Sequence, residues 1–184
     1  MITYITPSDK KIGPHVWASY HTMYRSRKSR RAARDAANLI ECALPYFREL
    51  LDFSKTVKVR IAGIKGRVNG RFSNDQELVM LDNQLIFNPY RTGAAPYRMI
   101  EVLAHELVHA EQYHQGRLAN TLGKRGWMHQ WNGEVNTNRG STYRAYRNQP
   151  WEIEAFSRQG DLAAKICTKL GIAVPLDVLV GKSD

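Results

Sequence analysis

The segment that decides the fold is residues 99–109, which read MIEVLAHELVH. Its last five residues, His105-Glu106-Leu107-Val108-His109, have the pattern His-Glu-x-x-His (HExxH). On an α-helix, residues four positions apart lie about 40° apart around the axis, so both imidazoles project from one face. Two neutral imidazoles at this spacing can bind one Zn²⁺, and the Glu106 carboxylate beside them can take a proton from a bound water. The segment therefore predicts a helix with two zinc ligands.

Apolar residues in the same segment place this helix in the core. Ile100, Leu103 and Leu107 recur at helical spacing, and histidines beside such an apolar face are unfavourable to bury without polar partners. The alternative is a half-exposed helix whose histidines are solvated or bonded to nearby carbonyl groups. The apolar context favours the metal site over that alternative.

The composition is that of one globular domain. The chain has 184 residues, 43% of them hydrophobic, enough to build a core without disulfides. No apolar run approaches the roughly 20 residues of a membrane span, and the first ten residues lack the layout of a signal peptide. The two cysteines, Cys42 and Cys167, lie in apolar helical patterns and are predicted to be small core residues. A reduced, cytoplasmic setting is expected, which is the host cytoplasm if a phage encodes the chain.

Positive charge is concentrated near the amino end. The net charge is +10, the pI is about 9.8, and the stretch from Arg25 to Arg34 is rich in arginine and lysine. Such a run is most often the solvated face of a helix. Clustered basic side chains also bind phosphates without sequence preference, so non-specific contact with nucleic acid or another polyanion is a second interpretation. No segment has the pattern of a base-reading module.

The predicted elements in the first half of the chain mix helix and strand. Apolar periodicity predicts a long helix over residues 26–51, with Pro45 marking a kink or a division into two shorter helices. Alternating apolar residues predict a strand over 56–64, and the Asn-Gly turn signal predicts a hairpin around Asn69-Gly70. Residues 77–87 are expected to form one strand or a short hairpin.

The second half is predicted to contain two helices and a loop. The HExxH helix is expected to run from Pro96 to about Gly116, and residues 118–148 are expected to form a loop with an irregular hairpin. A last helix should run from Pro150 to about Leu170, capped by Gly171. This order of elements predicts an α+β fold in a single domain, 1–184, with a basic helical region over 1–52 and a catalytic core over 53–184.

A catalytic zinc needs three protein ligands and one open position, so a third ligand must lie elsewhere. The metzincin spacing places a histidine six residues after the second, but position 115 is Gln115. His114 points away from the direction of His109 and is predicted to lie at the surface or behind the ligands. The third ligand is therefore expected on another element.

The last predicted helix offers two glutamates. On a wheel of about 100° per residue, Glu152 lies near the middle of the apolar face and Glu154 lies on the other side. A carboxylate on a core face must be paired or bind a metal, so Glu152 is the preferred ligand. Two alternatives remain: Glu152 could stabilise the first turn of the helix through its dipole, and Glu154 could orient a ligand histidine or pair with an arginine.

The HExxH segment, followed about forty residues later by Glu152-Ile153-Glu154-Ala155, resembles the gluzincin branch of the zincin metallopeptidases. It is most similar to the small zincin-like domains of phages and bacteria. In that family the third ligand is a glutamate on a second helix, often followed three positions later by a small residue. Ala155 holds that place after Glu152. The resemblance covers roughly Tyr97 to Gly160, and the first fifty residues lie outside it.

The resemblance implies a zincin-like fold, in which a small, twisted, mostly antiparallel sheet covers the metal helix. The edge strand of that sheet binds extended peptide, and Leu78 to Phe87 would be this strand. A second resemblance concerns His129. SprT-like proteases, which act on DNA-bound proteins, carry HExxH followed by a histidine in the next segment, and a basic surface would suit that role. The spacing from His109 to His129 is long for that family, and its Gly-His-Gly setting is absent.

The function implied is that of a zinc metalloendopeptidase acting on a protein or peptide substrate. The expected metal ligands are His105, His109 and Glu152. Glu106 would be the general base on a metal-activated water and would pass the proton to the leaving amine. Tyr146 or Tyr143 would stabilise the oxyanion, as a tyrosine does in some gluzincins. The alternative class is a non-catalytic, zinc-containing, nucleic-acid-associated protein of phage type.

Overall fold

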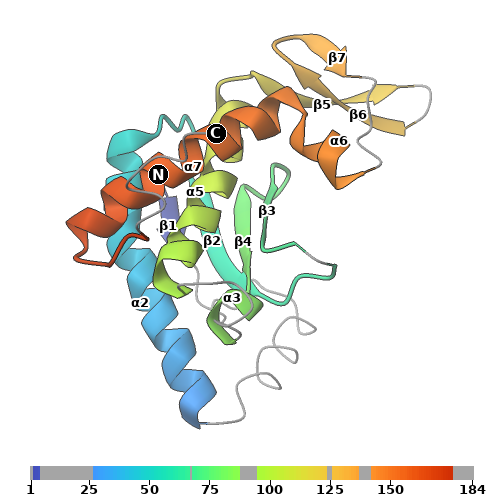
Figure 1. Ribbon diagram of the computed structural model, residues 1–184. Helices are drawn as coiled ribbons and strands as arrows, with labels where there is room; N and C mark the ends of the chain where they lie inside the picture. The colour runs from blue at the N-terminus through green and yellow to red at the C-terminus, as the bar shows by residue number, and fades with distance from the viewer. Residues whose placement is uncertain are drawn as a thin grey trace.

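Helix α5 (Ala95–His114), which carries the HExxH segment, packs against a four-stranded sheet and against helix α7 (Pro150–Lys169) (Figure 1). The structure is a computed structural model and describes residues 2–4, 27–66, 68–87, 95–123, 126–136 and 142–175. The other helices are α2 (Arg27–Leu50), α3 (Gln84–Phe87) and α6 (Tyr143–Arg147). The strands are β1 (Ile2–Tyr4), β2 (Val57–Ala62), β3 (Gly70–Ser73), β4 (Leu78–Asp82), β5 (Leu118–Gly123), β6 (Gly126–Trp131) and β7 (Glu134–Asn136). The described part of the chain is α+β, as predicted.

Helix α5 is buried along most of its length. Ile100, Leu103 and Leu107 are fully buried in the main hydrophobic core, where each contributes about 1.5–3 kcal/mol relative to an exposed position. Gly116, with φ +71°, adopts the left-handed conformation that ends a helix. The predicted bounds of the HExxH helix are confirmed.

The four-stranded sheet is mixed, with the order β1-β2-β4-β3. β1 and β2 are parallel, β2 and β4 are parallel, and only β3 and β4 are antiparallel. The prediction of one mostly antiparallel sheet is therefore wrong for the sheet that covers α5. Helix α2 connects β1 to β2, and a helical crossover of this kind joins parallel neighbours. Alternating apolar residues identify a strand but not the direction of its partner.

Two further expectations for this sheet are corrected. The stretch over 78–87 was expected to be an edge strand, but β4 lies inside the sheet, β3 holds the edge, and residues 84–87 form the short helix α3. Asp82 ends the strand because its side-chain oxygens accept hydrogen bonds from the backbone N–H groups of Gln84, at 2.7 Å, and Ile64, at 3.0 Å. The carboxylate therefore starts a helical turn where the pattern indicated more strand.

The expected hairpin turn at Asn69-Gly70 is also wrong. Gly70 is the first residue of β3, and the turn between β3 and β4 lies at residues 74–77, where Glu77 has φ +48°. The two-residue Asn-Gly turn of this chain is instead Asn132-Gly133, where both residues have positive φ, as a type I′ turn requires.

Helix α2 is a single 24-residue helix that continues through Pro45, so a division into two helices is wrong. Ile40, Ala43 and Phe47 supply its fully buried side. Cys167 is buried as predicted, but Cys42 is exposed, since it lies on the solvent side of α2. Arg25 and Ser26 lie outside the described residues.

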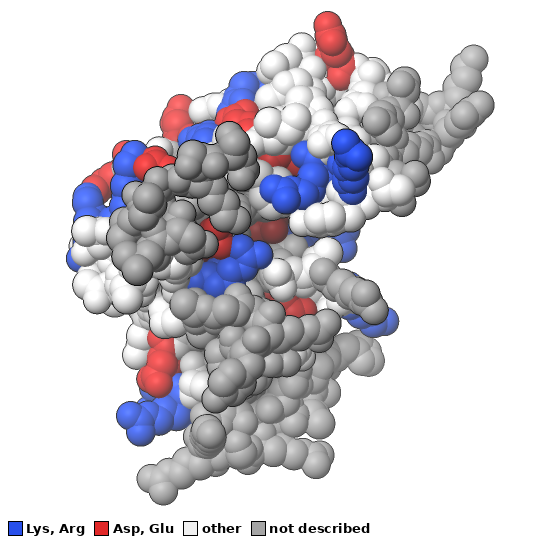
Figure 2. Space-filling model, viewed as in Figure 1, with Lys and Arg blue, Asp and Glu red and all other residues white. Residues whose placement is uncertain are grey.

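Acidic and basic side chains are interspersed over the face of the molecule shown in Figure 2. In the described part of the chain, no helix combines the length and the apolar character needed to cross a membrane.

In the stretch 118–148, expected to be a loop with an irregular hairpin, residues 118–123, 126–131 and 134–136 form a regular antiparallel sheet of three strands in the order β5-β6-β7 (Figure 1). The short helix α6 follows, and the Thr142 hydroxyl caps it by accepting a hydrogen bond from the Ala145 N–H at 3.1 Å. Helix α7 then begins at Pro150 and is followed by Gly171, which has φ +68°. The predicted start and end of this last helix are confirmed.

Candidate metal centre

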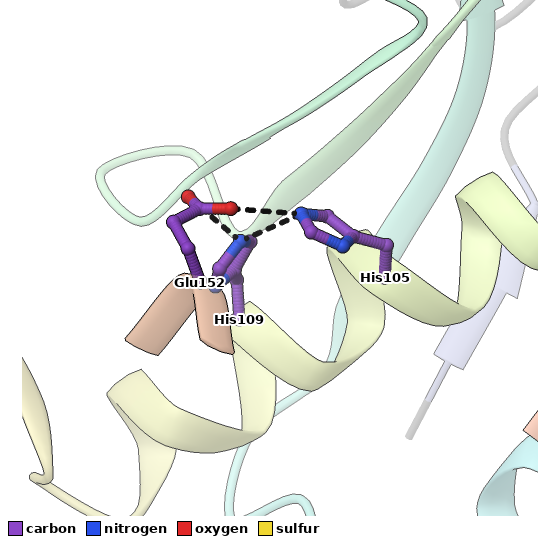
Figure 3. Close-up of side chains that lie close together, drawn as sticks. All are labelled: His105, His109 and Glu152. Atoms are coloured by element: carbon purple, nitrogen blue, oxygen red, sulfur yellow. Dashed lines mark hydrogen bonds and ion pairs between the residues drawn. The ribbon is translucent and has the colours of Figure 1, made fainter. Parts of the chain in front are cut away.

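His105, His109 and Glu152 converge on one point between α5 and α7 (Figure 3). The Nε2 atoms of the two histidines are 3.1 Å apart. His105 Nε2 lies 3.2 Å from Glu152 Oε2, and His109 Nε2 lies 3.3 Å from Glu152 Oε1. All three residues are buried. This is the set of residues that the sequence predicted as metal ligands.

The packing of two helices creates this arrangement. His105 and His109 are one turn apart on α5, and Glu152 lies in the first turn of α7, which crosses α5 at that level. Ala155, one turn further along α7, is fully buried, and its small side chain allows the two helices to approach closely. The carboxylate is thereby held opposite the two imidazoles.

Two glutamines orient the imidazoles. His105 Nδ1 lies 2.8 Å from Gln159 Oε1, and His109 Nδ1 lies 2.9 Å from Gln112 Oε1. The amide orientations are fixed, because Gln112 Nε2 donates to the Trp151 carbonyl at 3.0 Å and Gln159 Nε2 donates to a carboxylate oxygen of Glu101 at 3.3 Å. Each Nδ1 therefore carries the proton, and each Nε2 can present a lone pair to the centre.

The cluster is consequently a group of electron-pair donors facing one another. Glu152 Oε2 is buried and has no hydrogen-bond partner of its own among the described residues. Burial lowers the pKa of His109, but Glu152 and Glu106 raise it more, so the net shift is upward and the centre favours positive charge. A metal ion would supply that charge and would use all three donors at once. The group can hold a metal ion.

Glu106 lies beside the cluster, under the edge of the sheet. It is buried, and burial raises the pKa of its carboxyl group, although His109, His105 and the backbone N–H of Phe72 act in the opposite direction. Strand β3 passes so close that a Cβ atom on Gly70 would lie 2.8 Å from both Cγ and Oε1 of Glu106. Gly70 is therefore required by close packing against Glu106.

This contact predicts the effect of adding one methyl group. Replacing Gly70 with alanine should lower the free energy of unfolding by about 1–3 kcal/mol, because the new Cβ overlaps Glu106 and Val102. Gly160 in α7 is the matched control, since a Cβ there meets nothing within 4 Å. Gly160→Ala should instead raise stability by up to about 1 kcal/mol. Urea denaturation of both variants measures the difference, and equal midpoints would contradict this packing.

Tyr146 and Tyr143, the two candidate oxyanion donors, are separated by the structure. The Tyr146 hydroxyl lies near the Glu152 carboxylate, and burial together with that carboxylate raises the pKa of Tyr146 well above its usual value. Tyr143 stacks on Tyr146 with ring centroids 6.5 Å apart, but its side chain is mostly exposed. Only Tyr146 reaches the cluster. Burial raises the pKa of Glu152, but His105, His109 and the Tyr146 hydroxyl outweigh it and lower that pKa to about 2.

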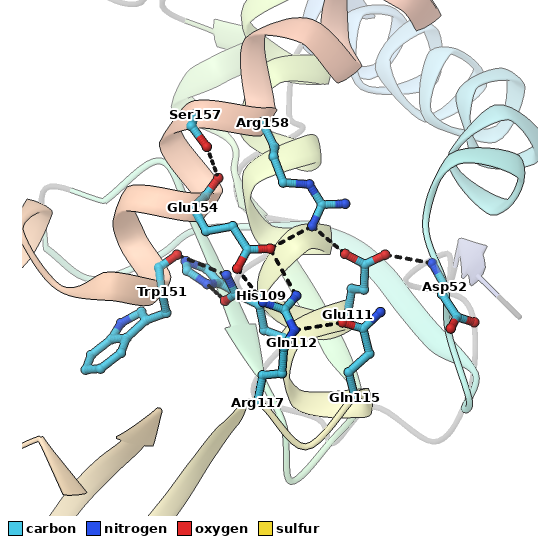
Figure 4. A network of polar contacts seen from close by, with 10 residues as sticks. All are labelled: Asp52, His109, Glu111, Gln112, Gln115, Arg117, Trp151, Glu154, Ser157 and Arg158. Carbon is cyan, nitrogen blue, oxygen red and sulfur yellow. Dashed lines mark hydrogen bonds and ion pairs between the residues drawn. The ribbon is translucent and has the colours of Figure 1, made fainter. Parts of the chain in front are cut away.

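Glu154 takes the second role that the sequence left open for it, that of an ion-pair partner (Figure 4). Its carboxylate binds Arg117 and Arg158, and Arg158 also binds the buried Glu111 at 2.6 Å. Glu111 in turn accepts the backbone N–H of Asp52 at 2.8 Å. This network joins α5, α7 and the segment after α2, and it fixes the position of α7 that places Glu152 at the metal centre.

The two other histidines considered as ligands lie outside the three-residue group. His129 on β6 contacts Asn120 Oδ1 through Nδ1 at 2.8 Å and packs its ring against Trp151. His114 lies with Nε2 2.7 Å from Glu77 Oε2, and its side chain is buried rather than at the surface. Of the candidates for the third ligand, the structure therefore places only Glu152 in one group with His105 and His109.

Sequence reasoning missed three contributions to the centre: the orienting amides of Gln112 and Gln159, the close approach of Gly70, and the Glu111–Arg158 network. Gln112 follows His109 by three residues on the same helix face, which was a usable signal. The others depend on contacts between distant segments and leave no local pattern.

Comparison of the chain with protein-family models, with curated proteins and with solved structures gives no match.

Proposed function

We propose that the chain is a zinc-dependent metallopeptidase, of the gluzincin-like type that the sequence suggested, whose metal ligands are His105, His109 and Glu152. The observation that carries the proposal is the buried convergence of these three donors next to the buried carboxylate of Glu106. Two imidazole nitrogens and one carboxylate oxygen form a set that Zn²⁺ uses in catalytic sites, where a fourth position stays open.

The residues of the chain have separate roles in the proposed hydrolysis. A zinc ion bound at the centre would supply a Lewis acid that makes water more acidic and polarises a carbonyl group. Glu106 takes the proton of the attacking water as its oxygen bonds to the carbonyl carbon, and gives that proton to the amine as the C–N bond breaks. The raised pKa of Glu106 suits a group that must both take and release a proton.

Tyr146 is proposed as the hydrogen-bond donor to the oxyanion. Its raised pKa keeps the hydroxyl protonated at neutral pH, and the hydroxyl lies near the Glu152 carboxylate of the proposed centre. A donor directed at the developing charge is worth about two to three orders of magnitude in rate in acyl-transfer enzymes.

The edge of the sheet supports a peptide as the substrate. Strand β3 pairs with β4 on one side, and among the described residues no strand covers its other side. An extended peptide can add to such an edge through main-chain hydrogen bonds. The same strand packs against Glu106 at Gly70, so a peptide along this edge would pass close to the proposed general base.

Metal removal tests the proposal. Treatment with 1,10-phenanthroline should abolish cleavage of casein and of a peptide library, because the proposed reaction depends on the ion held by the three ligands. One equivalent of Zn²⁺, added after the chelator is removed, should restore cleavage. Metal analysis of the same samples would follow zinc content alongside activity. Equal cleavage by the metal-free protein would contradict the proposal.

The basic start of α2 supports a second, non-catalytic candidate, a zinc-containing protein that contacts nucleic acid. Arg31 and Arg34 are exposed there, and the net charge is +10. A protein that binds zinc, cleaves nothing and binds DNA with a steep salt dependence would fit this candidate.

A further inference from the structure

Helix α6 holds an arginine close to the proposed metal ligands. The Cζ atom of Arg147 lies 4.1 Å from the ring centroid of Phe156, and that ring lies 4.6 Å, centroid to centroid, from the imidazole of His105. The three side chains thus form a row of contacts, called the stack below, in which the Phe156 ring is tilted by 57° to the His105 imidazole. Tyr146, the neighbour of Arg147, lies near Glu152 of the same centre. Both contacts fix α6 beside the site.

Arg147 has no acidic partner in the part of the chain that the structure describes. No carboxylate there forms an ion pair with it, and the residue is exposed. By contrast, Arg117 and Arg158 are both bound by glutamates. A guanidinium that stacks on an aromatic ring keeps its N–H groups free around its edge, in the fork geometry that matches a carboxylate. The stack therefore holds Arg147 in place without using its hydrogen-bond donors.

The surroundings of Arg147 are suited to an anion. Arg144 lies one turn earlier on the same helix and is also exposed. Glu152, which contacts His105, and Glu106 belong to the proposed centre, where a divalent cation would balance their charge.

We infer that Arg147 is a specificity residue that binds a carboxylate of the substrate, either an acidic side chain or the free carboxyl end of the peptide. This inference rests on the proposed peptidase function. His105 and Arg147 are separated by one contact of 4.6 Å and one of 4.1 Å, both to the Phe156 ring. An extended peptide advances about 3.3–3.6 Å per residue. The bound carboxylate therefore lies within about three residues of the bond that is cleaved.

Peptide pairs that differ only in Glu against Gln test this inference, because the two side chains have nearly the same shape. The wild-type protein should cleave the Glu member about tenfold faster, the effect of one charge-assisted hydrogen bond. Arg147→Met, which keeps an apolar side chain on Phe156, should remove the preference, and Arg147→Glu should reverse it. Lys58→Glu on the exposed side of β2 makes the same change of charge away from the site and should leave the preference unchanged.

A binding measurement separates this inference from the proposed hydrolysis. The full chain carrying Glu106→Gln, with and without Arg147→Glu, is immobilised, and the peptides it retains are identified by mass spectrometry. Retention of acidic peptides that depends on Arg147 supports the inference even if the wild-type protein cleaves nothing. Loss of retention on amidation of the carboxyl end would assign the carboxylate to that end. Equal cleavage and equal retention of the Glu and Gln peptides, or the absence of any retained peptide, would overturn the inference.

Discussion

Replacing Glu152 with alanine is expected to weaken zinc binding by more than about 100-fold. Loss of a residue that only supports a ligand lowers metal affinity by up to about 100-fold, and Glu152 is itself a proposed ligand. The carboxylate contacts both imidazoles, and its loss would leave two histidines, one fewer than the three protein ligands of a catalytic zinc site. Competition with a zinc-chelating dye measures the affinity. Circular dichroism should show that α5 and α7 remain folded, since the apolar packing between them and the Arg158–Glu111 ion pair do not involve Glu152.

Two matched variants make this result specific. Glu154→Ala removes a glutamate from the same helix turn, but its partners are Arg117 and Arg158. It should therefore keep zinc while lowering the free energy of unfolding by about 1–2 kcal/mol. His129→Ala should also keep zinc, because His129 contacts Asn120 and Trp151. Full zinc occupancy in Glu152→Ala, or its loss in His129→Ala, would show that the ligand set is wrong.

Replacing Glu106 with glutamine should lower the rate of peptide cleavage by about 10²–10⁴-fold, the usual contribution of a general base. The amide has nearly the size of the carboxylate, so it fits below Gly70 and can still accept the Phe72 N–H. It cannot take a proton from water. Zinc content and thermal stability should stay close to those of the wild-type protein, because Glu106 is not one of the three converging donors.

The comparison of activity with zinc content distinguishes the two proposed functions. Loss of cleavage with retained zinc supports a peptidase. If the wild-type protein and Glu106→Gln are equally inactive on every protein and peptide tested, catalysis is excluded as the role of the centre. The binding of DNA at several salt concentrations would then test the non-catalytic candidate.

The helices of this fold could be predicted because their signals are local. The bounds of α5 and α7 follow from apolar periodicity, from Pro96 and Pro150 near their starts, and from Gly116 and Gly171 just after their ends. The sheet could not be predicted in the same way. Strand direction depends on which distant segment lies alongside, and no residue in β2 records that β1 and β4 are its parallel neighbours.

Gly70 shows why a local pattern can mislead. Asn69-Gly70 is a strong turn signal, but this glycine is present because a helix side chain occupies the space of a Cβ. Glu152 could be predicted as the third converging residue because it is a charged residue on an apolar helix face. Charged side chains are rarely buried without a partner. The glutamines behind the histidines and the partners of Glu154 required the three-dimensional structure.

The position of Glu152 on the last described helix has a consequence for biosynthesis. A ribosome exposes α5 well before α7, so the nascent chain first carries only two of the three converging residues and lacks Gln159, which orients His105. The centre is completed when α7 docks and the pairs from Arg158 to Glu111 and Glu154 form. Under the proposed function, metal capture would therefore wait until the tertiary structure is in place, and a truncated translation product without α7 would lack the proposed ligand Glu152.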